Sequence, residues 1–187
     1  MSAKPEYIST IEEIKSKKNI AFIGFMGSGK STIAKIISKK SGLKLVDIDK
    51  LIVEKTGMEI STIFEIHGEP YFRDIEEEIL KQVLRIDGQI ISCGGGVILR
   101  DSNRKLLKER AINCWLNNQA ETSISRIKQT SRPLLKTDNP LETAKSILSD
   151  RIEYYEEIAD IKLDTDELTI DQIVTYFYDI TYKTIFC

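Results

Sequence analysis

The chain has 187 residues, enough for one compact domain, and its 41% hydrophobic and 30% charged residues are those of a globular protein. A formal net charge of −2 argues against a nucleic-acid partner bound through bulk electrostatics, since such proteins need an excess of basic residues. No apolar run approaches the roughly 20 residues of a membrane helix, so a membrane is not an expected partner either.

The N-terminal segment, residues 1–18, is expected to be an extension of a single domain that occupies residues 19–187. It lacks the apolar core and the cleavage site of a secretory signal. Ile8, Ile11 and Ile14 recur every three residues, which favours a short helix packed on the domain, with a disordered extension as the alternative. We assign the extension no function.

After the extension, strand-like and helix-like segments alternate, which predicts a parallel sheet with helices on both faces, an α/β three-layer sandwich. A helix is expected over residues 30–40, ended by Gly42. Short helical stretches over 51–55 and 61–66 precede a long helix that begins near Glu69-Pro70, because proline suits a first helical position. The five expected strands are residues 19–24, 43–47, 89–93, 111–116 and 161–163.

Residues 128–140 are polar and contain two prolines between helical segments, which is typical of a surface loop, and we expect them to form a mobile lid. The three cysteines, Cys93, Cys114 and Cys187, lie at unrelated spacings and do not indicate a disulfide framework. We therefore expect a reduced, cytoplasmic protein. No apolar interface stripe is evident, so a monomer is expected.

The strongest motif is Gly24–Ser31, GFMGSGKS, which matches GxxxxGK[ST] between a predicted strand and a predicted helix. In such a P-loop, glycines let backbone N–H groups point at phosphate oxygens, and the following helix adds its positive N-terminal end. Lys30 is expected to bridge the β- and γ-phosphates of ATP, and Ser31 to bind Mg²⁺. The alternative is a glycine turn followed by a chance Lys-Ser pair. The expected ATP-binding residues are Gly27, Ser28, Gly29, Lys30, Ser31 and Thr32.

Two further strand ends carry candidate residues for the acceptor. Asp47 and Asp49 end the second predicted strand, where Asp47 would lie toward the metal ion and Asp49 would take the proton of an acceptor hydroxyl. A solvated turn with helix N-caps is the competing interpretation. The third strand ends in Gly94, Gly95 and Gly96, where a ligand could lie directly on the backbone.

Three arginines could meet an anionic acceptor or the ATP phosphates, because guanidinium groups bind carboxylate and phosphate bidentately. Arg73 lies one turn into the long helix, Arg132 in the expected lid, and Arg151 in a later helix. Taken singly, each is more often a surface residue in a salt bridge. The base-reading tetrapeptide of GTPases and a Walker-B strand are both missing, which favours a small-metabolite kinase.

Taken together, these motifs resemble shikimate kinase, a P-loop family with a nucleoside-monophosphate-kinase-like fold. The resemblance spans residues 19 to about 166. It implies a five-stranded parallel sheet, ATP with Mg²⁺, and transfer of a phosphoryl group to shikimate in aromatic amino-acid biosynthesis. The segments that carry it are Gly24–Thr32, Val46–Asp49, Gly68–Glu76, Gly94–Gly96 and Ser131–Leu135.

The resemblance also implies roles for single residues. Asp49 contacts the shikimate hydroxyls and acts as the base, while Arg73 and Arg151 hold the substrate carboxylate. Arg132 approaches the ATP phosphates from the lid, and Glu76 holds Arg73 through an i,i+3 pair. Further contacts with the substrate come from Phe64, Phe72, Gly94, Gly95 and Gly96.

Two features leave alternatives open. The segment before Arg132 is about one residue shorter than in some relatives, so adenine stacking by Arg126 is an open question, and residues 165–168 lack an arginine that some relatives carry. A kinase acting on gluconate is a rival function, although it would not be expected to carry the glycine triplet together with Arg73. A silent nucleotide-binding module is a second rival, and it predicts damage at Asp49 or the arginines, which is not seen.

Overall fold

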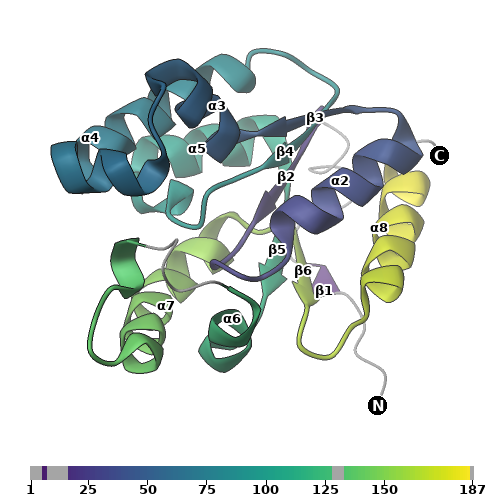
Figure 1. The fold of residues 1–187 in the computed structure, drawn as a ribbon. Helices are drawn as coiled ribbons and strands as arrows, with labels where there is room; N and C mark the ends of the chain where they lie inside the picture. The colour runs from purple at the N-terminus through teal and green to yellow at the C-terminus, as the bar shows by residue number, and fades with distance from the viewer. Residues whose placement is uncertain (1–5, 8–16, 128–132, 186–187) are drawn as a thin grey trace.

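The computed structural model describes residues 6–7, 17–127 and 133–185. In this part of the chain, one sheet runs in the order β1-β6-β5-β2-β4-β3, and its five longer strands are parallel as predicted (Figure 1). The strands are β1 (Glu6–Tyr7), β2 (Asn19–Ile23), β3 (Lys44–Asp47), β4 (Gln89–Ser92), β5 (Ala111–Asn117) and β6 (Ile161–Asp164). The helices are α2 (Lys30–Ser41), α3 (Ile48–Thr56), α4 (Ile60–Val83), η1 (Val97–Leu99), α5 (Asp101–Arg110), α6 (Ala120–Arg126), η3 (Pro133–Leu135), α7 (Pro140–Ile158) and α8 (Ile170–Ile185).

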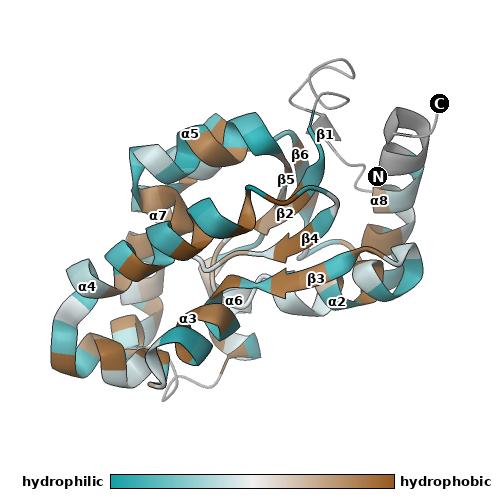
Figure 2. Cartoon of the chain, turned by 90° about the horizontal axis from the view of Figure 1, so that it is seen from above, coloured by the Kyte–Doolittle hydropathy of each residue, from teal (hydrophilic) through white to brown (hydrophobic). Residues whose placement is uncertain are grey.

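Strand β2 lies inside the sheet and is buried along its whole length. Its side chains alternate between two cores: Ala21 and Ile23 pack on the side of α4, α5 and α7, and Ile20 and Phe22 on the side of α2 and α8. In Figure 2, hydrophobic residues (brown) lie in β2 and β4, while α5 is mostly hydrophilic (teal). Each fully buried Ile or Phe side chain stabilises the fold by roughly 1.5–3 kcal/mol. Helices thus cover both faces, which confirms the predicted layers.

The structure describes residues 6–7, 17 and 18 of the N-terminal segment. Glu6–Tyr7 form a strand that pairs antiparallel with β6. Without β1, strand β6 would present an unpaired edge of the sheet. Lys17 adds a buried ion pair with Asp160, with Nζ 2.6 Å from Oδ1. The isoleucines on which the helix prediction rested lie at 8–14, outside the described residues.

Helix α4 is kinked at Gly68, whose φ of 79° and ψ of 171° are not helical. The kink lies between the predicted stretch 61–66 and the predicted long helix near Glu69-Pro70, so that boundary is confirmed. A φ in the left-handed region favours glycine, and Pro70 fits the start of the second segment. This second segment carries Arg73 and Glu76.

The expected lid, 128–140, is described only from residue 133 onward. Residues 133–135 form η3, and α7 begins at Pro140, with Asn139 as its N-cap. Arg132 lies outside the described residues. Among the helices that the structure describes, none is long and apolar enough to cross a bilayer.

Candidate active site

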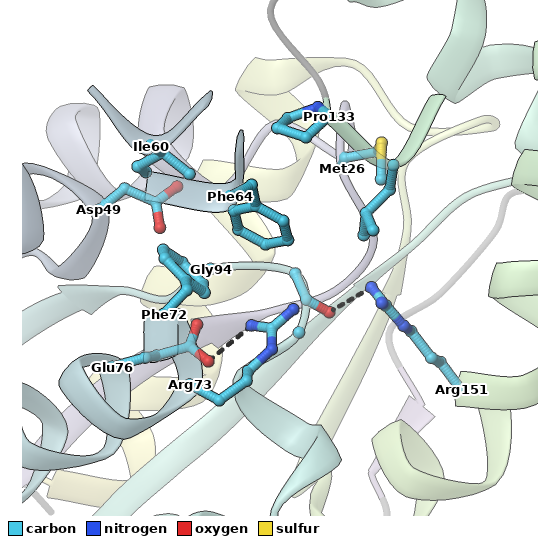
Figure 3. Close-up of a pocket in the computed structure, with 13 residues that line it drawn as sticks. Met26, Asp49, Ile60, Phe64, Phe72, Arg73, Glu76, Gly94, Pro133 and Arg151 are labelled. Atoms are coloured by element: carbon cyan, nitrogen blue, oxygen red, sulfur yellow. Dashed lines mark hydrogen bonds and ion pairs between the residues drawn. The ribbon is translucent and has the colours of Figure 1, made fainter. Parts of the chain in front are cut away.

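The carboxyl ends of the parallel strands meet at one edge of the sheet, where open α/β sheets bind ligands. Two adjoining hollows lie there. The phosphate hollow is lined by the loop between β2 and α2 together with Arg126. The acceptor hollow is lined mainly by α4 and the glycine segment Gly94–Gly96, with Arg151 of α7 on one side (Figure 3). Four residues line both hollows: Met26, Asp49, Gly94 and Gly95.

The loop before α2 has the backbone that the motif predicts. Gly24, Gly27 and Gly29 have φ of 139°, 75° and 94°, which favour glycine. A side chain at Gly27 would also meet the carbonyl oxygen of Ser123 at 2.8 Å. Gly29 is the N-cap of α2 and forms no side-chain hydrogen bond to the helix. The first N–H groups of α2 can therefore bind an anionic ligand.

Lys30 is buried beneath this loop, and its Nζ donates to the carbonyl oxygens of Gly24 at 2.9 Å and Phe25 at 2.7 Å. The ammonium group is therefore held at the rim of the phosphate hollow. The hydroxyl of Ser31 lies 3.1 Å from that of Ser92. Of the six predicted ATP-binding residues, five line the phosphate hollow, and Ser28 lines a neighbouring hollow with Arg126.

Asp47 and Asp49 have different surroundings although one residue separates them. Asp47 caps α3, because its Oδ1 accepts a hydrogen bond from the Lys50 backbone N–H at 3.3 Å. It does not line the phosphate hollow, although it lies opposite Ser92 in the β3–β4 register. Asp49, in the first turn of α3, lines both hollows and points into the acceptor hollow (Figure 3). The structure thus gives Asp47 the capping role that competed with its metal role.

The glycine segment is glycine because charged side chains and the P-loop pack directly on its backbone. A methyl group at Gly94 would meet Glu76 Oε1 at 2.8 Å and Asp49 Oδ1 at 2.9 Å. One at Gly96 would meet the Arg73 guanidinium, with Cζ at 2.5 Å. Asp49, Glu76 and Arg73 therefore converge on this segment.

Gly95, between them, packs against the P-loop. A methyl group there would lie 3.3 Å from the backbone nitrogen of Met26 and 3.4 Å from the carbonyl oxygen of Gly24. Its own carbonyl accepts a hydrogen bond from Arg151 Nη1 at 3.3 Å. Gly95 is thus the point where the phosphate loop and the acceptor side touch.

Arg73 is held by two carboxylates on its own helix. Its Nη1 lies 2.7 Å from Glu76 Oε2, and its Nη2 lies 2.8 Å from Glu69 Oε1. Burial alone would lower the pKa of Arg73, but the charges and hydrogen bonds of these two glutamates outweigh it and raise that pKa. Glu76 is fully buried, and burial raises its pKa against the effect of Arg73. The predicted i,i+3 pair is present.

Arg151 has only neutral hydrogen-bond partners in the described part of the chain. It is 6% exposed, and no carboxylate there forms an ion pair with it. Burial lowers the pKa of Arg151, and the charge of Arg73 acts in the same direction. A buried cation without a carboxylate partner is costly unless a ligand supplies the anion. The acceptor hollow therefore favours an anionic ligand beside Arg151.

The remaining wall of the acceptor hollow is apolar. Phe64 and Phe72 lie with their ring centroids 4.8 Å apart, and the Arg73 guanidinium lies 4.9 Å from the Phe72 centroid. Pro133 lies across the hollow from Asp49 (Figure 3). An end with two arginines, a carboxylate and an apolar wall fit a small ring acid with hydroxyl groups.

Sequence reasoning missed several residues at the two hollows. Met26 lines both hollows, Ile60 lines the acceptor hollow, and Tyr155 donates to the Gly95 carbonyl at 2.5 Å. Tyr155 lies four residues after Arg151, so helical spacing could have found it. Nothing in the sequence pattern marks Met26 or Ile60.

Arg126 bonds to Thr165, with Nη2 2.9 Å from its carbonyl oxygen. It lies between the phosphate hollow and the neighbouring hollow that Thr165, Leu168 and Ile173 line. Arg126 of α6 therefore contacts Thr165, the first residue of the segment 165–168 that lacks an arginine.

A family model for shikimate kinase matches residues 26–181. A shikimate kinase of Thermodesulfovibrio yellowstonii is 46% identical over 157 residues, which cover 83% of this chain and 90% of the relative. One of Sulfurihydrogenibium sp. is 42% identical over 158 residues, covering 84% and 93%. Among solved structures, the shikimate kinase from Acinetobacter baumannii in complex with shikimate has a TM-score of 0.85 at 28% identity, covering 93% of this chain and 98% of that one. A gluconokinase from Sinorhizobium meliloti, at 17% identity and a TM-score of 0.58, shares the fold, with 90% of this chain and 94% of that one covered.

Proposed function

We propose the following reaction and residue roles for this chain, which belongs to the shikimate kinase family. The enzyme transfers the γ-phosphoryl group of ATP to the 3-hydroxyl of shikimate, giving ADP and 3-phosphoshikimate on the way to chorismate and the aromatic amino acids. The observation that carries the roles is that Asp49 lines both hollows, so one carboxylate stands where the two substrates would meet.

Shikimate would bind with its carboxylate toward Arg151 and Arg73. Glu69 and Glu76 offset the charge of Arg73, whereas no carboxylate in the described part of the chain forms an ion pair with Arg151. A substrate carboxylate would offset the charge of Arg151, which supports this orientation. The Phe64 and Phe72 rings would lie against the carbocyclic ring. The hydroxyl groups would then face Asp49 and the glycine segment.

In the transfer step, the 3-hydroxyl oxygen forms a bond to the γ-phosphorus, and the bond from that phosphorus to the β,γ-bridging oxygen breaks as ADP leaves. The hydroxyl proton passes to the Asp49 carboxylate, which orients the hydroxyl beforehand. Lys30 lines the phosphate hollow and would stabilise the negative charge that develops on the γ-phosphoryl oxygens. Arg132 is proposed to approach the same oxygens from the lid.

Ser31 is proposed to hold Mg²⁺ together with the nucleotide phosphates. Its hydroxyl belongs to the phosphate hollow, and a single hydroxyl fits a metal ion that keeps waters and phosphate oxygens as ligands. The described residues contain no cluster of three His, Cys, Asp or Glu that could hold a metal ion by itself. When bound, Mg²⁺ neutralises charge on the β- and γ-phosphates. Asp47, beside Ser92, is proposed to order the waters of the ion.

A coupled assay of ADP release tests this function. We expect acceptor-dependent turnover with shikimate, and only background release with gluconate or without an acceptor. Turnover with gluconate alone would transfer the assignment to the rival kinase. Nucleotide binding without acceptor-dependent release would leave only the silent module.

A cytoplasmic location and a monomeric state are also proposed. Cys93 and Cys114 are both free thiols, which supports a reducing compartment. Light scattering on a sizing column tests the monomer, and a mass near twice the 21.3 kDa of the chain would contradict it.

A further inference from the structure

Tyr155 lies directly behind the acceptor hollow without lining it. Its side chain is fully buried on α7, and its ring stacks on Trp115 with centroids 5.8 Å apart and an interplanar angle of 17°. A phenylalanine would fill the same volume and keep this stacking. The hydroxyl therefore needs its own explanation, because a buried hydroxyl is costly unless it is hydrogen-bonded.

The hydroxyl joins Arg151 to the glycine segment. Tyr155 Oη donates its only proton to the Gly95 carbonyl oxygen at 2.5 Å. The Arg151 guanidinium donates to the same carbonyl oxygen at 3.3 Å, so the two side chains share one acceptor. Arg151 and Tyr155 thus converge on the Gly95 carbonyl oxygen, which fixes them relative to each other.

We propose that Tyr155 is a positioning residue for the phosphoryl acceptor: its hydroxyl aims Arg151 at the acceptor carboxylate and fixes the Gly95 peptide. This inference rests on the proposed role of the acceptor hollow. It goes further because it assigns a function to a residue that lines neither hollow.

Arg151 and Arg73 are held by chemically different groups. Arg73 is oriented by two glutamates that also offset its charge. Because Glu69 and Glu76 already offset the charge of Arg73, a carboxylate on Arg151 as well would leave no net positive charge for the substrate carboxylate. A tyrosine hydroxyl orients the group and leaves its charge to the ligand, and burial raises the pKa of Tyr155, so the hydroxyl stays neutral.

The test replaces the hydroxyl alone. Tyr155→Phe is expected to raise the KM for shikimate about tenfold, in the range of a hydrogen bond to a charged group, and to leave the KM for ATP within about twofold. The matched control is Tyr154→Phe, one residue earlier on α7, whose ring lies over Arg104 and lines neither hollow. The control is expected to match the wild type in both constants.

A double-mutant cycle separates positioning from a general packing effect. If Tyr155 acts through Arg151, the loss in kcat/KM for shikimate caused by Tyr155→Phe disappears in an Arg151→Ala background. An equal loss in both backgrounds, an equal rise in the two KM values, or no change in either would overturn the proposal. Wild-type turnover with shikimate, measured alongside, tests the proposed function separately. The fluorescence of Trp115, the sole tryptophan, checks by thermal unfolding that every variant is folded.

Discussion

Gly96 lies directly against the guanidinium group of Arg73, so closely that a methyl group at position 96 would meet Cζ at 2.5 Å. The φ of Gly96 is −108°, which any residue adopts. Glycine is therefore needed here for space alone. One side of the acceptor site is thus formed by a charged group lying on bare backbone.

We expect Gly96→Ala to raise the KM for shikimate by roughly 10- to 100-fold, because the added methyl group displaces Arg73 from its position beside the acceptor. The KM for ATP should stay within about twofold, since Gly96 does not line the phosphate hollow. Steady-state kinetics with each substrate varied in turn provide the measurement. An unchanged KM for shikimate would show that Arg73 does not hold the acceptor.

Asp49→Asn should lower kcat by a factor of about 10²–10⁴, the usual contribution of a positioned general base. The amide keeps the size of the side chain and removes the proton acceptor. Binding of ATP, measured by calorimetry without acceptor, should be little changed. A kcat within tenfold of the wild type would remove Asp49 from the role of base.

Asp47 offers a test that separates capping from metal binding. Asparagine caps helices as well as aspartate does, so Asp47→Asn should keep the stability of the fold, while Asp47→Ala should lower it by about 1 kcal/mol. If Asp47 also orders the waters of Mg²⁺, both variants need more Mg²⁺ for half-maximal activity. The metal role is refuted if Asp47→Asn shows the wild-type dependence on Mg²⁺.

Glu76 predicts a specific dependence of stability on pH. Burial raises its pKa in the folded state above the ordinary 4.5, so the folded protein holds this proton more tightly than the unfolded chain. The resulting stabilisation is complete below pH 4.5 and is lost as the pH rises through the raised pKa. Glu76→Gln removes the titrating group, so its free energy of unfolding should fall less across this window. Urea unfolding at a series of pH values checks this, and parallel curves for the two proteins would contradict it.

The local features of this fold could be predicted because their causes are local. An apolar strand followed by glycines that need positive φ marks the P-loop, and the predicted strand 89–93 is observed as Gln89–Ser92. The boundary at Gly68 follows from the same rules, since a glycine before Glu69-Pro70 is a natural break in a helix.

Features that depend on distant contacts could not be predicted. Glu6–Tyr7 pair with a strand more than 150 residues later, and two residues carry no periodicity. The reason for each glycine in Gly94–Gly96 also lies in side chains from other elements. The sequence could not show that Asp47 caps α3 while Asp49 lines the hollows, because this depends on where α3 begins. The role of Arg132 stays a prediction.

The two outer edges of the sheet are protected by different means. On one side β1 covers β6, and on the other β3 is bounded by the charged residues Lys44 and Asp47. The charges on β3 discourage another chain from pairing with that strand. The edge of β6 is protected only as long as β1 is paired with it. Shortening the chain past Tyr7 would therefore leave β6 open to strand exchange and fibrillar association along that flank alone. A purification tag in place of these residues would carry the same liability.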